Sequence, residues 1–365
     1  MTKVGSDFSG VGAFNQALMR LGIEYDEVFA CDMDKFARET FIHNYGEPKY
    51  YPKDVYEREI PKESLDIYMT SPPCQAFSLA GKRLGKDDKR GVLFFNSHEF
   101  IKKNKPRYFI FENVKGLLSD DNGNTFKEWL NMLGGKSVNG LPVLFAYEDS
   151  VPYHIYYKVM NAKKHGVPQN RERVFIVGIR DDADNHFRWA KEEHLYKQLK
   201  DVLENEVDEK YFLTNDKIEQ IASWKSRQNP LRDNLYEKDS KKVMSCLLAR
   251  GRVGKGVAQT LDTQCNQGVI QLNKSKESGG VQPYQQNRVY DINGVNPALN
   301  AGQQTWGGNI INTQQIRRLT PRECFRLMDF PDTFSWTCSD SQAYKQAGNS
   351  IVVRCLELII KQFNL

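Results

Sequence analysis

Short apolar runs alternate with amphipathic or polar stretches through the first 180 residues of the chain. These runs predict strands at the N-terminus and near 27–31, 49–51, 65–69, 107–111, 154–160 and 171–179, with helices at 15–21, 35–45, 92–105 and 123–133. The run 107–111 is apolar without alternation, as expected of a strand buried on both faces of a parallel sheet. Strands that alternate with helices in this way predict an α/β fold.

The pattern changes near residue 181. Residues 181–242 are charged and weakly periodic, and residues 251–308 are rich in Gly, Gln and Asn with short β-like runs. Within the second stretch, 256–262 resembles 294–300, either by chance or because two β-hairpin units are similar. Gln and Asn side chains both donate and accept hydrogen bonds, so this surface suits the reading of base edges. A polar loop region without a ligand is the alternative.

A helix start is encoded after residue 316. Thr320 fits the N-cap, Pro321 the first helical position and Glu323 the third, which together form a capping box. A last apolar helix, 351–360, is predicted to pack back on the first part of the chain. We therefore expect one domain of residues 1–180 plus 335–365, and a smaller, mostly β or irregular domain of residues 181–334 that includes the 316–334 hinge.

Composition narrows the class of protein. The 365 residues are 40% hydrophobic and 27% charged, and the formal net charge of +5 is compatible with a nucleic-acid partner without requiring one. The seven cysteines are scattered without a C-x-x-C pair, which argues against a disulfide framework or zinc site and for a reducing compartment. No apolar run approaches the roughly 20 residues of a membrane span, and no signal-peptide core is present. We expect a cytoplasmic protein with no metal and no membrane partner.

One cysteine stands out by its setting. Pro72 and Pro73 follow the apolar run 65–69 and hold the next residue, Cys74, in a stiff, extended entry. This arrangement presents a thiol at the carboxyl edge of a sheet, ahead of a glycine-marked basic loop over 81–91. Cys74 is therefore a candidate nucleophile, and a buried structural cysteine before a surface loop is the alternative.

Two acidic loops suggest a nucleoside site. Gly10 and Gly12 form a turn between a strand and a helix, and Asp32 ends the second strand, where an acid commonly binds ribose hydroxyls. The third glycine of the dinucleotide pattern is missing, which favours a nucleoside without a pyrophosphate, such as the cationic S-adenosylmethionine. Asp54 offers a second acid for an adenine amino group. The alternatives are a plain βαβ turn and a solvated loop aspartate.

A carboxylate and two arginines complete the candidate chemistry. Glu112 emerges directly from the strand 107–111, where a buried acid is costly and a functional role is favoured over a satisfied structural acid or a helix cap. Arg171 and Arg173 lie two residues apart as the chain enters a strand, so both are expected on one face. Their planar donor forks suit a base edge or phosphate, and a cross-strand salt bridge is the alternative.

These groups combine in one reaction, the methylation of carbon 5 of cytosine. Addition of the Cys74 thiolate at carbon 6 would make carbon 5 nucleophilic, and the Glu112 carboxyl would assist by protonating or hydrogen-bonding ring N3. Arg171 or Arg173 would contact the exocyclic oxygen or a nearby phosphate. Because carbon 6 cannot be reached inside a duplex, the base would have to be flipped out.

Taken in order, the motifs resemble the DNA (cytosine-5) methyltransferase family in its bacterial and phage form. The matching stretches are 8–12, Asp32-Met33, Asp54-Val55, Pro73-Cys74-Gln75, Leu93, Glu112-Asn113-Val114, 169–173, 318–323 and Gly348-Asn349-Ser350. The resemblance implies cofactor contacts at Phe8, Gly10, Gly12, Asp32, Met33, Asp54, Val55, Pro73, Leu93, Asn349 and Ser350. The family more often has a glutamate and an aromatic residue where this chain has Asp32 and Met33.

The resemblance also implies the architecture and partners of the protein. It predicts a Rossmann-like S-adenosylmethionine-dependent methyltransferase domain, a target-recognition domain and a monomer acting on double-stranded DNA, associated with the nucleoid in a prokaryote or phage-infected cell. S-adenosyl-L-homocysteine would be the product, and a cognate restriction endonuclease would act separately. An RNA (tRNA) cytosine-5 methyltransferase with the same chemistry and a catalytically silent DNA-binding module are the alternatives.

Overall fold

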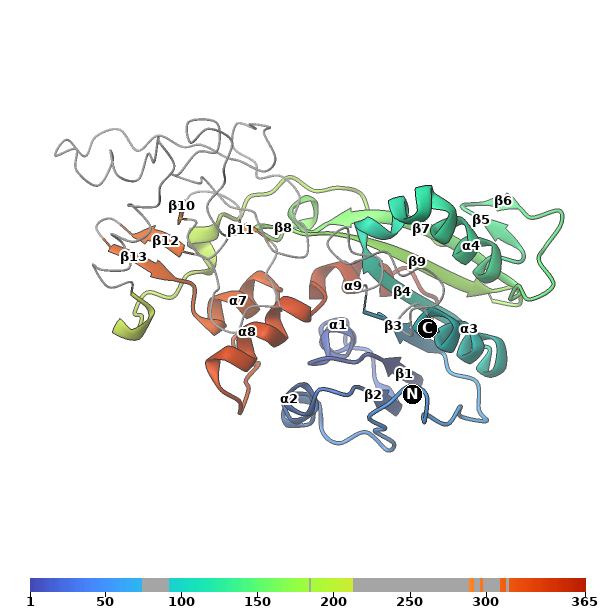
Figure 1. Ribbon diagram of the computed structural model, residues 1–365, viewed down its shortest axis with the longest axis horizontal. Coiled ribbons are helices and arrows are strands. Elements are labelled where there is room, and N and C mark those ends of the chain that lie inside the picture. The colour runs from blue at the N-terminus through green and yellow to red at the C-terminus, as the bar shows by residue number, and fades with distance from the viewer. Residues whose placement is uncertain (74–91, 184, 213–288, 292–295, 298–308, 313–314) are drawn as a thin grey trace.

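The computed structural model describes residues 1–73, 92–183, 185–212, 289–291, 296–297, 309–312 and 315–365 (Figure 1). Cys74 and the basic loop that follows it lie outside the described residues. The proposed repeat of 256–262 and 294–300 also lies outside them, apart from Asn296 and Pro297.

A central eight-stranded sheet organises the fold. Its strand order is β2-β1-β3-β4-β9-β7-β5-β6. The strands are β1 (Thr2–Asp7), β2 (Tyr25–Cys31), β3 (Ile67–Thr70), β4 (Tyr108–Val114), β5 (Ser137–Val138), β6 (Leu141–Pro142), β7 (Tyr153–Asn161) and β9 (Glu172–Arg180). The first four run parallel, and β9 runs antiparallel to both β4 and β7. The chain leaves β1 on one side to form β2 and returns on the other to form β3, so the switch point of the sheet lies at β1.

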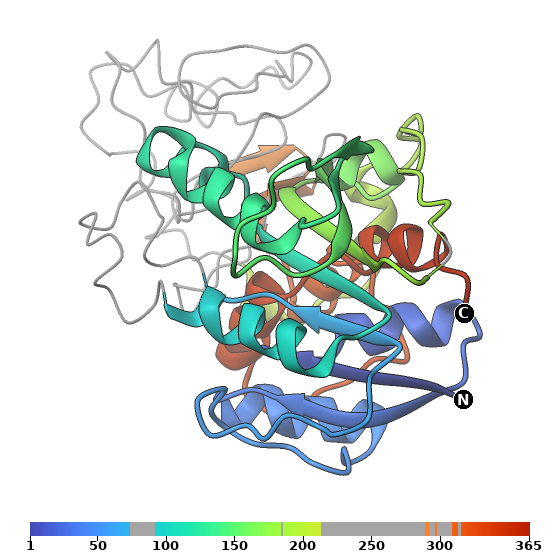
Figure 2. The same ribbon diagram turned by 90° about the vertical axis from the view of Figure 1, so that its right-hand side faces the viewer.

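Helices cover both faces of the sheet (Figures 1 and 2). They are α1 (Ala13–Arg20), α2 (Lys35–Tyr45), α3 (Val92–Asn104), α4 (Asn124–Leu133), α7 (Pro321–Leu327), α8 (Asp340–Asn349) and α9 (Val353–Ile360), with short 3₁₀ turns η2 (Lys115–Gly123), η3 (Ala162–His165), η4 (Leu199–Val202) and η5 (Glu209–Tyr211). One apolar cluster gathers α1, α7, α8 and α9, and the other gathers α3 and α4. The predicted α/β fold is confirmed.

One predicted strand is wrong. Residues 49–51 form no strand, although they run beside β2. Only two backbone hydrogen bonds join the segments, from Ala30 N to Tyr50 O at 3.1 Å and from Asp32 N to Pro52 O at 3.4 Å. Pro52 follows Tyr51 in the sequence, and proline cannot donate to a ladder, so the pairing stops before a strand forms.

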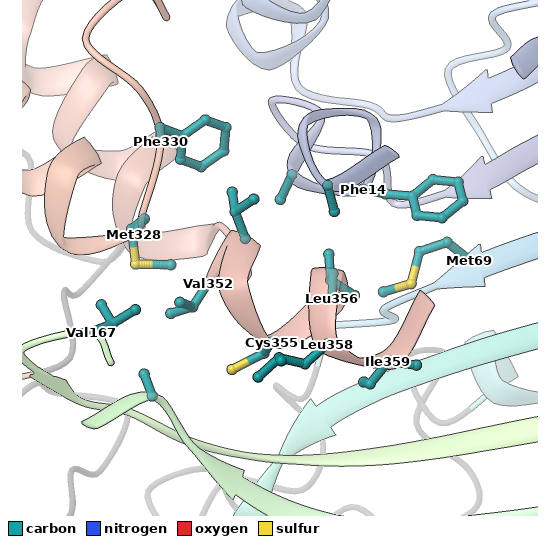
Figure 3. Packing of buried hydrophobic residues seen from close by; sticks show 14 of the residues in the cluster. Phe14, Met69, Val167, Met328, Phe330, Val352, Cys355, Leu356, Leu358 and Ile359 are labelled. Carbon is teal, nitrogen blue, oxygen red and sulfur yellow. The ribbon is translucent and has the colours of Figure 1, made fainter. Parts of the chain in front are cut away.

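The last helix returns to the first part of the chain, as predicted. The side chains of α9 lie between Phe14 and Met69 on one side and Met328 and Phe330 on the other (Figure 3). Beyond α9, the Phe363 ring stacks on Tyr108 of β4, with 4.4 Å between ring centroids. The same apolar cluster includes Phe187, Leu199, Val202 and residues 319–334, so both ends of the expected smaller region pack on the core of the first.

The described parts of the smaller region include four short strands. A three-stranded sheet contains β10 (Val289–Asp291), β12 (Asn309–Asn312) and β13 (Gln315–Arg318). A second pairing joins β11 (Asn296–Pro297) to β8 (Gln169–Asn170), which directly precedes β9. The segment before β9 therefore touches both regions of the molecule.

The capping box predicted at α7 is confirmed, and it extends into a buried ion pair. Thr320 Oγ1 accepts from Glu323 N at 3.2 Å, and Glu323 accepts from Thr320 N at 2.8 Å. The Glu323 carboxylate also receives both Nη atoms of Arg317, at 2.8 and 2.7 Å, and the backbone N–H of Glu204 at 2.8 Å. Through this carboxylate, the chain at residue 204 is joined to the chain at residue 317.

Replacing Arg317 with methionine is expected to lower the free energy of unfolding by about 3–5 kcal/mol, because Glu323 would keep a buried charge without its partner. The two side chains are 2% and 0% exposed. Urea denaturation measures the change. The matched control is Lys103→Met, which breaks the exposed pair with Glu99 and should cost no more than about 0.5 kcal/mol. Equally small losses of unfolding free energy in both variants would contradict a buried Arg317–Glu323 ion pair.

Candidate active site

The turn after β1 is held by an aspartate from the neighbouring strand. Gly10 N donates to Asp32 Oδ2 at 2.8 Å, and Asp34 N donates to Asp32 Oδ1 at 2.8 Å. Phe8, Gly10 and Gly12 all have positive φ angles, of 57°, 54° and 82°. Burial raises the pKa of Asp32, and its two backbone donors act against that rise. Asp32 therefore shapes the glycine turn at the switch point, where the sequence predicts a ribose contact.

The glycine turn is open at Gly10. A Cβ on Gly10 would meet nothing within 4 Å, so the backbone faces open space. Met33 follows Asp32 with 81% of its side chain exposed and offers an apolar surface beside the acid. The acid that holds this turn, Asp32, suits the hydroxyl groups of a positively charged ligand better than it suits a phosphate. The residues present therefore fit S-adenosylmethionine.

A second loop is joined to the first by Arg38. Its Nη1 donates to Asp32 O at 3.4 Å and to Pro52 O at 3.0 Å, and its guanidinium lies 3.9 Å from the centre of the Tyr51 ring. Asp54, two residues after Pro52, accepts from Tyr56 N at 2.9 Å, and Val55 is buried. The structure thus brings the segments with Asp32 and Asp54 to the same edge of the sheet.

Substitution of Gly12 by alanine is expected to destabilise the fold by more than about 1–2 kcal/mol and to raise KM for S-adenosylmethionine. A Cβ there would lie 2.2 Å from Tyr45 Cε2, in addition to the strain of φ 82°. Gly22→Ala is the matched control, since Gly22 has φ 67° but open space around its Cβ position. Thermal unfolding and steady-state kinetics compare the two variants. A KM unchanged in both would show that the turn at Gly12 does not hold the cofactor.

The chain that leads to Cys74 is fastened to both neighbouring strand ends. Asn113 Nδ2 donates to Pro72 O at 3.3 Å, and Ser71 Oγ lies 3.5 Å from Phe8 O. Pro72 is buried and Pro73 is exposed. The predicted nucleophile follows Pro73 in the sequence, outside the described residues, so the described part of the site ends one residue before it.

Glu112 pairs with Arg173 at the carboxyl end of β4. The Glu112 carboxylate lies 3.1 Å from Arg173 Nε, and only 10% of the Glu112 side chain is exposed. Burial raises the pKa of Glu112, and the guanidinium groups of Arg173 and Arg171 offset part of that rise. The cross-strand pair weighed as an alternative for the arginines is thus present, with Glu112 as the acid. Glu172 instead pairs with Lys115 at 3.0 Å.

Arg171 takes different partners. Its Nη2 donates to Gly348 O at 3.0 Å and to Ser350 O at 2.8 Å, and the residue is only 4% exposed. Asn349, between these two carbonyl groups, ends α8 and is exposed. The structure therefore brings Arg173 to Glu112 and brings Arg171 to the segment that resembles the closing cofactor motif.

The remaining predicted residues lie around the same edge of the sheet. Leu93 stands in the first turn of α3 and is partly buried. Lys345 of α8 donates to Asp34 Oδ2 at 2.6 Å, which joins the helix before Asn349 to the N-cap of α2. The C-terminal segment is thus fastened to the loop that follows Asp32.

The sequence did not predict the buried ion pair between Asp7 and Arg58, which lies at the end of β1, just before the glycine turn. Arg58 Nε lies 2.9 Å from Asp7 Oδ1, and Tyr68 OH donates to Asp7 Oδ2 at 2.6 Å. Burial raises the pKa of Asp7, and Arg58 and Tyr68 act against the rise. Asp7 was visible as the residue before Phe8, but nothing in the local sequence around Arg58 indicated that it would reach the end of β1.

Fold and site together define a class of protein. A doubly wound sheet with a glycine turn and an acid at its switch point is a nucleoside-binding fold, and the buried carboxyl–arginine pair on a neighbouring strand is suited to acid–base chemistry. The sequence pattern of the family described as C-5 cytosine-specific DNA methylase matches residues 2–364. The chain belongs to this family and is a cytosine-5 DNA methyltransferase of the bacterial and phage type.

Individual relatives agree with the assignment. The chain is 31% identical to the orphan methyltransferase M.SPRI of Bacillus phage SPR, over 99% of this chain and 97% of the phage protein. It is also 31% identical to the type II methyltransferase M.HhaI of Haemophilus parahaemolyticus, over 96% of this chain and 91% of that protein. A solved structure of a DNMT2 variant from Spodoptera frugiperda has a TM-score of 0.65 at 16% identity, covering 99% of both chains, and supports the fold.

Two further observations concern the described residues alone. Within them, no helix has the length and apolar character needed to cross a bilayer. No three His, Cys, Asp or Glu side chains in the described part of the chain gather in a group that could hold a metal ion.

Proposed function

We propose that the protein methylates carbon 5 of a flipped-out cytosine within a specific sequence of double-stranded DNA, through a covalent bond between Cys74 and carbon 6. The observation that carries this proposal is the buried Glu112–Arg173 pair, with the adjacent Asn113 fastening the chain two residues before Cys74. An acid held next to the entry of a thiol is what the addition step requires.

Each residue has a distinct part in the reaction. The Cys74 thiolate adds to carbon 6 while the Glu112 carboxyl donates its proton, or a hydrogen bond, to ring N3. Arg173 orients Glu112 and would donate a hydrogen bond to the exocyclic oxygen. Carbon 5 then gains the methyl group, a base removes the carbon 5 proton, and elimination releases the thiolate. The raised pKa of Glu112 keeps its carboxyl protonated to a higher pH than usual.

S-adenosylmethionine, when bound, supplies an electrophilic methyl group. The residues that would hold it are those around the switch point: the turn of Phe8, Gly10 and Gly12 would face the ligand, Asp32 its ribose and Met33 its adenine. Asp54, Val55, Pro73, Leu93, Asn349 and Ser350 would complete the pocket. We assign no metal to the reaction.

The proposal extends to organisation and partners. Residues 1–180 plus 335–365 would form the catalytic domain, and residues 181–334 would read the DNA. The enzyme would act as a monomer in the cytoplasm, with any cognate restriction endonuclease acting separately. The family described as C-5 cytosine-specific DNA methylase matches residues 2–364, which favours duplex DNA over tRNA as the substrate.

Bisulfite sequencing of DNA from cells that express the chain tests the proposal directly. Protected cytosines in one recurring sequence are expected, and none when Cys74 is replaced. Labelled cofactor with duplex DNA or tRNA separates the two substrates, and the RNA enzyme would label tRNA alone. A denaturant-resistant adduct with DNA containing 5-fluorocytosine is expected as well, because a protein that only binds DNA cannot form one.

A further inference from the structure

We infer that Arg171 is a positioning residue for the cofactor-closing segment 348–350, rather than a group that contacts the target base. The inference rests on the proposed function, because it assigns 348–350 to the edge of the cofactor pocket. Two arginines that are only two residues apart would then have different roles. Arg173 would orient Glu112, which contacts the base, and Arg171 would position Asn349, which contacts the cofactor.

The first argument is the geometry of the Arg171 guanidinium. Nη2 alone donates to two carbonyl groups, Gly348 O at 3.0 Å and Ser350 O at 2.8 Å, in a side chain that is 4% exposed. These two peptide groups lie on either side of Asn349. A single planar cation therefore fixes the backbone before and after the exposed residue that would face the cofactor.

The second argument concerns the end of α8. The last carbonyl groups of a helix have no partner within the helix, and burying them without a donor is costly. In a longer helix Gly348 O would accept from Val352 N, but α8 ends at Asn349, so Gly348 O needs a donor from elsewhere. A charged donor makes a stronger bond to such a carbonyl than a neutral one. Lysine could not reproduce this contact, because its ammonium ends one atom short of the Nη position of arginine.

The third argument is the place of Arg171 in the fold. The preceding residue, Asn170, pairs with Pro297 of β11, within the region that we propose reads DNA. Gln169 Nε2 donates to Leu327 O at 2.8 Å, at the end of α7. The short segment 169–173 therefore touches the recognition region, α7, the end of α8 and Glu112 in turn. Arg171 is the member of this segment that reaches the cofactor side.

The test compares Arg171→Lys with Arg173→Lys as the matched control. For Arg171→Lys we expect the Kd of S-adenosylhomocysteine, from calorimetry on the full chain, and KM for S-adenosylmethionine to rise about tenfold or more, the loss expected for a buried charged hydrogen bond. At saturating cofactor, kcat on plasmid DNA should stay within about threefold. Arg173→Lys should lower kcat and leave the Kd of S-adenosylhomocysteine unchanged.

A double-mutant cycle with Asn349→Ala shows whether Arg171 acts through Asn349. If it does, the two substitutions have non-additive effects on the Kd of S-adenosylhomocysteine. Arg171→Gln replaces the lysine variant if that one does not fold, since its amide can still donate to one carbonyl. Wild-type affinity in either Arg171 variant, a kcat loss like that of Arg173→Lys, or additive effects would each overturn the inference. Failure of the wild-type chain to bind S-adenosylhomocysteine would instead refute the proposed function.

Discussion

Replacing Cys74 with serine is expected to abolish methyl transfer, lowering kcat by at least about 10⁴-fold. A thiolate forms readily near neutral pH, whereas a serine hydroxyl holds its proton and adds poorly to carbon 6 of a pyrimidine. Transfer of a tritiated methyl group to plasmid DNA measures the loss. The affinity for S-adenosylhomocysteine should not change, because the substitution alters one atom of a side chain that would face the base.

Cys338→Ser is the matched control for this experiment. Cys338 is half-buried, and its Sγ accepts from Gln346 Nε2 at 3.4 Å, far along the chain from the proposed nucleophile. This variant should retain activity. Turnover in the Cys74→Ser protein within tenfold of the wild-type rate would refute the covalent mechanism, even if DNA were methylated at carbon 5.

The second large effect is expected at Glu112. Glu112→Gln keeps the size of the side chain and a hydrogen-bond donor for ring N3, but it removes the acidic proton and the charge that pairs with Arg173. We expect kcat to fall by about 10²–10⁴-fold, the range typical of a lost general acid. Single-turnover kinetics with saturating cofactor separate this chemical effect from changes in binding.

The pH dependence gives an independent check on Glu112. Because burial raises its pKa, the carboxyl holds its proton to a higher pH than usual, and kcat falls as the pH rises through that pKa. Glu112→Gln should remove this limb. Glu172→Gln is the control, since Glu172 pairs with Lys115 and should leave the limb intact. A limb that persists in the Glu112→Gln enzyme belongs to another group and would contradict the assignment.

Local signals in the sequence were sufficient for most elements of the fold. The α2 helix begins and ends where the pattern over 35–45 predicts, because Asp34 caps its N-terminus and Gly46 follows its C-terminus. The capping box at Thr320 depends on side chains only three residues apart. The strand predicted near 49–51 failed because strand formation depends on a distant partner, which offers only two hydrogen bonds there.

The sequence predicted which residues form the site better than it predicted which of them contact one another. Glu112 was expected at the end of a buried strand, and it lies there. The expectation that spacing would place Arg171 and Arg173 on one face assumed a continuous strand, but β9 begins at Glu172, between them. Their partners come from residues 112 and 348–350, and the partner of Asp7 comes from residue 58. Such distant contacts leave no trace in a local pattern.

The position of α9 has a consequence for the making of the protein in the cell. The apolar face of α1 leaves the ribosome early, yet the helix that covers it is encoded some three hundred residues later. At bacterial rates of translation, this face waits on the order of tens of seconds for its cover. The nascent chain therefore carries this apolar face uncovered until α9 is made, and a chain truncated before residue 353 would keep it exposed to proteases and to aggregation.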